Sequence, residues 1–265
     1  MRLPILSRAG RASIAVALLA SVSLVGMPAT VAAQEATTSS APLDRKEVEL
    51  IVRDYLLANP EIMLEVQQAL ETKQKEEQRL AGAGAISGAK DEIFRSPYDA
   101  VIGNPDGKVT IVEFYDYNCG YCKRAIEDMR ALTKGDPDLR YVLKEFPILG
   151  PDSQKAHVVS AAFHKLMPEK YGEFHSQLLG GQGRATEDSA VKIALSLGAD
   201  EAALREAMKD PKIPEVFNST YELATKLSIS GTPSYVIGNE VVFGALGHEV
   251  LAEKIEAARA CGTAC

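Results

Sequence analysis

The sequence predicts an α/β protein in which one sheet is divided by a helical insertion. Two observations support this prediction. Short apolar, β-branched runs that are typical of buried strands occur early, at residues 109–114 and 139–146, and again late, at residues 234–237 and 241–243. Between these pairs, residues 152–228 follow the periodicity of helices almost throughout. The predicted order is therefore β-α-β, a helical block, then β-β-α.

Composition narrows the classes of protein that the chain can belong to. Of 265 residues, 46% are hydrophobic and 25% are charged, which is typical of a globular protein. Acidic residues outnumber basic ones, 36 against 29, so the sequence lacks the basic excess that would neutralise phosphates and predicts no binding of nucleic acid. Four cysteines are too few for a small domain held together by disulfides.

The first 33 residues have the three parts of a secretory signal peptide. Arg2, Arg8 and Arg11 give a positive start, residues 12–27 are apolar, and Val31-Ala32-Ala33 supplies small residues for cleavage. The apolar run is shorter than the ~20 residues needed to span a bilayer. We therefore expect cleavage near Ala33 and a soluble protein in the periplasm, or otherwise exported, where disulfides persist.

A polar tail and two helices are expected next. Residues 34–43 have the composition of a disordered tail. Asp44 and Glu47 resemble a capping box, and Asn59-Pro60 divides the helical pattern of residues 44–80 into helices at 45–58 and 60–79. Their apolar stripe must be buried against the main domain or against other copies of the chain. The stripe consists of Val48, Val52, Tyr55, Ile62, Val66 and Leu70.

A linker then leads into the main domain. Gly82, Gly84 and Gly88 each cost a helix about 1 kcal/mol relative to alanine, so residues 81–95 are predicted to be a flexible linker with marginal helicity. The main domain is expected to cover residues 96–265.

The chemistry is expected at Cys119-Gly120-Tyr121-Cys122, which follows a strand and begins a predicted helix at 121–133. Unpaired N–H groups at a helix start favour a thiolate and lower the pKa of the first cysteine. Cys119 would then form a mixed disulfide that Cys122 resolves, and Lys123 adds a positive charge nearby.

Two other interpretations of this motif are weaker. A zinc site needs a second pair of ligands at suitable spacing, and the four histidines are scattered, so no metal site is predicted. An inert disulfide does not explain the position at a helix start. The histidines are His157, His164, His175 and His248.

Residues 112–123 (VEFYDYNCGYCK), with Ser230-Gly231-Thr232-Pro233-Ser234 about 110 residues later, resemble the thioredoxin-fold DsbA superfamily. Within it, the chain resembles the suppressor-of-copper-sensitivity branch, ScsC, over residues 48–260. The resemblance implies a thioredoxin fold with a helical insertion and no cofactor. The helices around Asn59-Pro60-Glu61 are similar to the oligomerisation segment of that branch, which implies a homo-oligomer, with a trimer favoured, formed through residues 44–80.

The resemblance also implies roles for individual residues. Pro233 matches the cis-proline that faces the redox pair, and the backbone of Thr232 would pair with an extended substrate. A glutamate six residues before the first cysteine lies beneath the pair in such proteins, so Glu113 would relay the proton of the resolving thiol. Tyr121, with Tyr115 and Tyr117, could form an apolar rim for substrates or could simply pack.

A second cysteine pair, Cys261 and Cys265, ends the chain. The five-residue spacing suits a structural disulfide, and a second redox pair is the alternative. The resemblance implies nothing about this pair.

The functional hypothesis is a periplasmic disulfide isomerase or reductase that acts on unfolded or misoxidised exported proteins. A membrane thiol reductase would be its electron donor. Two alternatives stay open. One is a DsbA-like oxidase that donates disulfides, and the other is a copper-binding or copper-tolerance protein, since two thiolates can hold copper(I).

Overall fold

The computed structural model describes residues 44–261. The predicted signal peptide, the tail at 34–43 and Cys265 lie outside the described residues. Within them the chain forms two compact units, one ending at Pro60 and the other beginning at Glu61.

The first unit contains helix α1, Arg45–Ala58, whose bounds are those predicted from the sequence. Asn59 ends the helix, because its backbone and its side-chain amide both donate to the carbonyl of Tyr55. The predicted capping box is wrong, since the side chain of Asp44 makes no capping hydrogen bond. No residue of α1 is buried, so its apolar side chains are exposed within this single chain.

The second unit begins with helix α2, Ile62–Gly88, followed by the short helix α3, Lys90–Phe94. The predicted helix end at residue 79 is therefore wrong, and most of the predicted linker at 81–95 is helical. That these residues act as a flexible linker stays a prediction. Packing offsets the cost of the glycines, because Ile86 and Ile93 are buried. At Gly82 a β-carbon would lie 3.7 Å from Val241 Cγ2, so the bare glycine backbone lies directly against the sheet edge.

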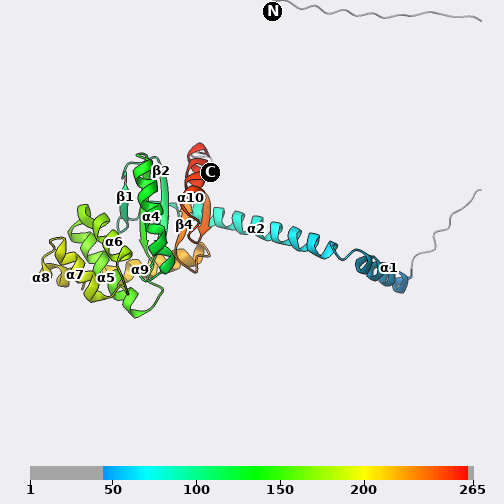
Figure 1. Cartoon of the computed structure of the whole chain (residues 1–265), viewed down its shortest axis with the longest axis horizontal. Coiled ribbons are helices and arrows are strands. Elements are labelled where there is room, and N and C mark those ends of the chain that lie inside the picture. The colour runs from blue at the N-terminus through cyan, green and yellow to red at the C-terminus, as the bar shows by residue number, and fades with distance from the viewer. Residues whose placement is uncertain (1–43, 262–265) are drawn as a thin grey trace, which may run out of the picture. The chain divides into compact units, whose positions relative to one another are not determined.

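One five-stranded sheet organises this unit (Figure 1). The strand order is β1-β3-β2-β4-β5, with β2 and β3 parallel and the other pairs antiparallel. Strand β1, a four-residue strand at the sheet edge, was not predicted, whereas the other four strands lie within one residue of their predicted ends. The strands are β1 Ala100–Gly103, β2 Val109–Tyr115, β3 Leu139–Glu145, β4 Ser234–Ile237 and β5 Glu240–Phe243.

Helices cover both faces of the sheet. Helix α4, Gly120–Gly135, and helix α10, His248–Cys261, pack on one face. Helix α3 and helix α9, Lys212–Lys226, pack on the other face with the end of α2. Alternation along β2 directs Ile111, Glu113 and Tyr115 towards α4, and Val112 and Phe114 towards α3.

The predicted helical insertion is confirmed, and its helices α5 to α8 gather together beside the sheet in Figure 1. They extend the core on the α4 face through side chains such as Phe163 and Phe174, whose rings stack. No helix within residues 44–261 is both long enough and apolar enough to span a membrane. The insertion contains α5 Pro151–Leu166, a 3-10 turn Pro168–Lys170, α6 Tyr171–Gly180, α7 Glu187–Ser196, α8 Glu201–Ala207 and α9.

Candidate active site

Two free thiols lie where strand β2 gives way to helix α4. Cys119 is the N-cap of α4, with an extended backbone, and its sulfur accepts a hydrogen bond from the Cys122 N–H at 3.4 Å. One of the unpaired amides of the first helical turn is therefore directed at this sulfur. Cys122 is buried one turn further along the helix.

The environment separates the pKa values of the two thiols. The pKa of Cys119 is lowered to about 5, chiefly by a hydrogen bond from the Cys122 thiol, against the opposing effect of partial burial. The Thr232 side chain and the backbone N–H groups of Cys122 and Tyr121 lower it further. Burial raises the pKa of Cys122, and the Cys119 hydrogen bond and the Glu113 charge raise it further. At neutral pH the site therefore presents a thiolate at Cys119 and a thiol at Cys122.

The ammonium group of Lys123, next to Cys122 in the sequence, is hydrogen bonded to the helical insertion. It donates to the carbonyls of Gly181 and Gly183, at 3.2 and 2.7 Å. The side chain therefore ties α4 to the insertion, and a contribution of its charge to the ionisation of the thiols stays a prediction.

The Thr232–Pro233 peptide bond is cis and faces the redox pair. In the thiol form, Cys119 Sγ donates to the Thr232 carbonyl at 3.1 Å. The Pro233 carbonyl accepts from the Gly244 N–H at 2.9 Å, so the loop is joined to the chain that follows β5. The sulfur thus lies within hydrogen-bond distance of a backbone group that an extended substrate could also approach.

Glu113 is buried on β2, on the face that α4 covers. The Tyr141 hydroxyl donates to its Oε2 at 2.7 Å, whereas Oε1 has no partner among the described residues. Burial raises the pKa of Glu113 to about 7; the Tyr141 hydrogen bond opposes this rise, and the charges of Cys119 and Asp128 add to it. A carboxyl with this pKa exchanges its proton readily at neutral pH.

Two residues that were not predicted as site residues, Asp116 and Asn118, hold the loop before Cys119. Asp116 is buried and accepts hydrogen bonds from the Asn118 N–H, the Leu149 N–H and the Ser153 hydroxyl. The Asn118 amide donates to the Ala185 carbonyl at 2.9 Å and accepts from its N–H at 2.8 Å. The insertion therefore positions the redox loop by direct contact, which the local sequence pattern could not reveal.

The three tyrosines divide into two groups. Tyr121 is 60% exposed, and the guanidinium of Arg124 lies 4.2 Å from its ring centroid. Tyr115 and Tyr117 are wholly buried, so they belong to the core and not to a substrate rim. Their hydroxyls join a buried polar network with Tyr171, which contacts Tyr115 at 2.8 Å.

Cys261 ends α10, and its predicted partner Cys265 lies outside the described residues, so that disulfide stays a prediction. Within residues 44–261, no group of three or more His, Cys, Asp or Glu side chains is arranged to hold a metal ion.

Comparisons with known proteins agree with this geometry. The model of the DSBA-like thioredoxin domain matches residues 110–256, and that of the copper resistance protein ScsC N-terminal domain matches residues 44–77. Disulfide bond formation protein D of Bacillus subtilis is 28% identical over 187 residues, covering 66% of this chain and 82% of that protein. The chain also matches Na(+)/H(+) antiporters of two Salinispora species, of whose length it covers only 24%.

Solved structures extend the similarity to both parts of the chain. A thioredoxin-like oxidoreductase from Silicibacter pomeroyi is 38% identical with a TM-score of 0.61, covering 64% of this chain and 97% of that one. Proteus mirabilis ScsC in a transitional conformation is 31% identical with a TM-score of 0.61, covering 84% of this chain and 99% of that one.

The fold and the cysteine pair thus define a thioredoxin-like protein of the DsbA class. The chain belongs to the family of DSBA-like thioredoxin domains, and it carries an amino-terminal segment of the ScsC type. The predicted thioredoxin fold with a helical insertion is confirmed.

Proposed function

We propose that the chain is a thiol–disulfide oxidoreductase that acts as an isomerase or reductase on exported proteins. The observation that carries the proposal is the opposite ionisation of two free thiols one helical turn apart, Cys119 as thiolate and Cys122 as buried thiol. A thiolate is the form that attacks a disulfide, and a protected second thiol can resolve the adduct.

The reaction would proceed by two exchanges. The Cys119 thiolate attacks one sulfur of a client disulfide, forming a mixed disulfide while the other client sulfur leaves as a thiolate and takes a proton from water. In isomerisation a second client thiolate then attacks the client sulfur of the mixed disulfide, which forms a new client disulfide and returns Cys119 as thiolate. No net electron transfer occurs.

In reduction, Cys122 ends the mixed disulfide. Its sulfur attacks Cys119 Sγ and its proton passes to Glu113, while the client sulfur leaves as a thiolate that takes a proton from water. The client is then a dithiol, and the pair has become a disulfide. Two electrons have then moved to the client, so an exported thiol reductant must restore the pair. A membrane thiol reductase is the donor that we propose.

A DsbA-like oxidase is the second candidate. The low pKa of Cys119 favours it, because stabilising the thiolate stabilises the reduced pair and makes its disulfide more oxidising. Threonine before Pro233 and the amino-terminal helices support the isomerase. The copper-binding alternative would depend on the two thiols alone.

We further propose that residues 44–80 assemble the chain into a homo-oligomer, a trimer by resemblance. Many apolar side chains on these helices are exposed, and other copies of the chain could bury them. The exposed side chains on α1 are Val48, Leu50, Ile51, Val52, Tyr55, Leu56 and Leu57, and those on α2 include Met63, Leu64, Val66 and Leu70. The molar mass in solution of the full chain tests this, with Ile51→Asp expected to lower it towards the monomer.

The activity is tested by recovery of a client with scrambled disulfides in a glutathione buffer. We expect wild type to restore the client, Cys119→Ser to be inactive, and Cys122→Ser to accumulate a mixed disulfide. Alkylation of Cys119 by iodoacetamide should show a midpoint near pH 5, following its lowered pKa. Full activity of Cys119→Ser would refute the proposal, and transfer of disulfides to a reduced client without isomerisation would favour the oxidase.

A further inference from the structure

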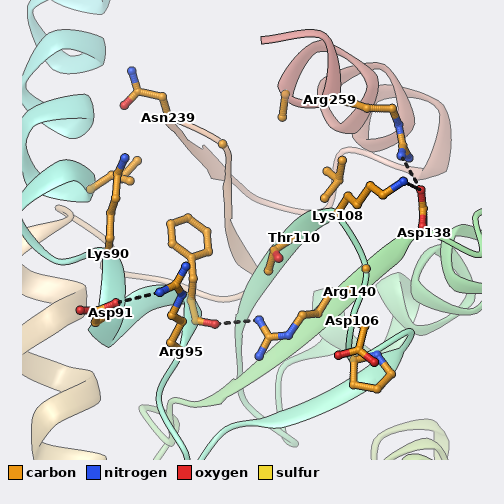
Figure 2. Close-up of a pocket in the computed structure, with 17 residues that line it drawn as sticks. Lys90, Asp91, Arg95, Asp106, Lys108, Thr110, Asp138, Arg140, Asn239 and Arg259 are labelled. Atoms are coloured by element: carbon orange, nitrogen blue, oxygen red, sulfur yellow. Dashed lines mark hydrogen bonds and ion pairs between the residues drawn. The ribbon is translucent and has the colours of Figure 1, made fainter. Parts of the chain in front are cut away.

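A basic cavity lies at the end of the sheet opposite to the redox pair (Figure 2). Its volume is about 990 Å³. Val109 and Thr110, at the start of β2, line it, whereas Cys119 follows the end of the same strand. The other walls come from α3, the turn before β2, the start of β3, the β4–β5 turn and the end of α10.

The side chains that line the cavity carry a net charge opposite in sign to that of the whole chain. Three carboxylates line it beside five cationic side chains, which leaves two positive charges in excess in a protein of net charge −7. The cations are Lys90, Arg95, Lys108, Arg140 and Arg259, and the carboxylates are Asp91, Asp106 and Asp138. Such a local excess attracts anions.

The carboxylates leave most of the cationic N–H groups without partners. Arg95 lies 3.8 Å from Asp91, and Lys108 lies 3.7 Å from Asp138, distances that allow ion pairing without a hydrogen bond. Lys90 makes no ion pair or hydrogen bond within residues 44–261. Arg259 differs, because it hydrogen bonds Asp136 and Glu256 and also lies 3.9 Å from Asp138 (Figure 2).

Two guanidinium groups, those of Arg95 and Arg140, lie close enough for their charges to interact. Arg140 is half-buried and donates to the Phe94 carbonyl at 2.7 Å, and Figure 2 shows the Arg95 guanidinium beside this bond. Burial lowers the pKa of Arg140; the charge of Arg95 lowers it further, and the charge of Asp99 opposes this. Asp99 itself is held by a buried ion pair with Lys144. An anion at the two arginines would relieve their repulsion.

We propose that this cavity binds a polyvalent oxyanion of the phosphate class, held by Arg95, Arg140, Lys90 and Lys108. Guanidinium groups match phosphate oxygens in pairs, and ammonium groups add point charges. The Thr110 hydroxyl and the Asn239 amide line the same cavity and supply neutral donors. The volume exceeds that of a single phosphate group, so the ligand is a condensed or organic phosphate, either free in solution or as a lipid headgroup.

Binding there would join two parts of the second unit. Lys90 and Arg95 come from α3 and the residue after it, whereas Lys108 and Arg140 come from the sheet. An anion that touches both would fix α3 on the sheet, and a ligand that binds only the folded state raises its stability.

The test titrates inorganic diphosphate into the full chain at constant ionic strength, by calorimetry and by thermal unfolding. Lys90→Gln and Arg95→Gln remove one exposed cation each. Lys192→Gln is the matched control, since Lys192 is an exposed lysine on α7 that makes no ion pair among the described residues. We expect each cavity variant to weaken binding about tenfold, as loss of a charge-assisted hydrogen bond predicts, and the control to change it by less than about twofold.

Vesicles distinguish a lipid headgroup from a phosphate free in solution as the source of the ligand. Binding to phosphatidylcholine vesicles that contain phosphatidylglycerol, but not to phosphatidylcholine alone, and loss of that binding in Arg95→Gln, would assign the site to a lipid headgroup. Binding of diphosphate without vesicle binding would assign it to a free phosphate. The proposal is refuted if neither probe binds, or if both cavity variants bind like Lys192→Gln. Disulfide exchange by Cys119 should be unchanged in all three variants.

Discussion

Two buried glutamates on adjacent parallel strands have opposite environments. Glu113 on β2 receives one hydrogen bond, from Tyr141, and its second oxygen has no partner among the described residues. Glu145 on β3 accepts from His157, from the Ser160 hydroxyl at 2.6 Å and from the Tyr171 hydroxyl at 3.0 Å. Burial raises the pKa of Glu113 to about 7. At Glu145 burial acts in the same direction, but the imidazole of His157 and the hydroxyl donors overcome it and lower the pKa.

The comparison shows that the number of hydrogen-bond donors, and not burial alone, decides whether a buried carboxyl group is ionised. The Tyr117 N–H donates to His157 Nε2, so the ring carries its proton on Nδ1 and donates it to Glu145. A carboxylate with three donors stays ionised and holds the insertion to the sheet. A carboxylate with one donor is poised to exchange a proton, which suits Glu113 beneath Cys122.

The largest expected difference between the two glutamates is in the free energy of unfolding that is lost when each is replaced by alanine. Glu145→Ala leaves the buried His157 N–H without its acceptor and removes the carboxylate that the Ser160 and Tyr171 hydroxyls share. We expect it to lower the free energy of unfolding by roughly 4 kcal/mol. Glu113→Ala is the matched control, because it leaves one donor unpaired and removes a poorly solvated charge, and should cost about 1 kcal/mol near pH 8. Urea unfolding of the reduced proteins measures both. Equal losses would contradict the comparison.

The second prediction concerns two effects of Glu113: how the stability of the fold depends on pH, and how fast Cys122 resolves a mixed disulfide. The folded protein holds the Glu113 proton up to a pKa of about 7, above the ordinary 4.5, so this group stabilises the fold fully below pH 4.5 and the contribution is lost as the pH rises through 7. Glu113→Gln should remove that loss, making the reduced protein more stable above pH 7 by roughly 3 kcal/mol.

The same substitution should slow the release of a mixed disulfide by roughly 10²-fold, because the Cys122 proton loses its acceptor. Urea unfolding from pH 4 to 9 and stopped-flow release of a model client measure the two effects. The surface substitution Glu127→Gln should change neither of them. A release rate that does not depend on Glu113 would show that the proton leaves by another route.

The redox pair could be predicted from sequence because its chemistry is local. A CxxC at a strand-to-helix junction places one sulfur at the helix start whatever surrounds it. Glu113 was singled out by the offset that the family resemblance implies, together with strand alternation. The same alternation directs Tyr115 inward, so its burial was within reach of the sequence. The partners of these groups were not, because Asn118 meets Ala185 only through the fold.

The errors in the prediction of the fold also come from contacts that the local sequence does not show. Helix propensity includes the cost of each glycine in residues 81–89. It does not include the burial of Ile86, which depends on packing against the sheet. Strand β1 has four residues and gains its identity from pairing with β3 at the sheet edge, so no local pattern marked it. Both features depend on contacts between segments far apart in the chain.

The smallest expected effect concerns the one donor of Glu113. Tyr141→Phe removes the hydrogen bond that opposes the raised pKa, so the midpoint of the Glu113-dependent loss of stability should move up by about one pH unit, with a cost of about 1 kcal/mol below it. Tyr235→Phe is the matched control. Tyr235 is paired with Glu113 in the sheet register and is equally buried, but its hydroxyl makes no hydrogen bond to Glu113. Unfolding from pH 5 to 9 should shift in the first variant alone, and a shift of the same size in both would mean that burial, not the Tyr141 hydroxyl, sets the pKa of Glu113.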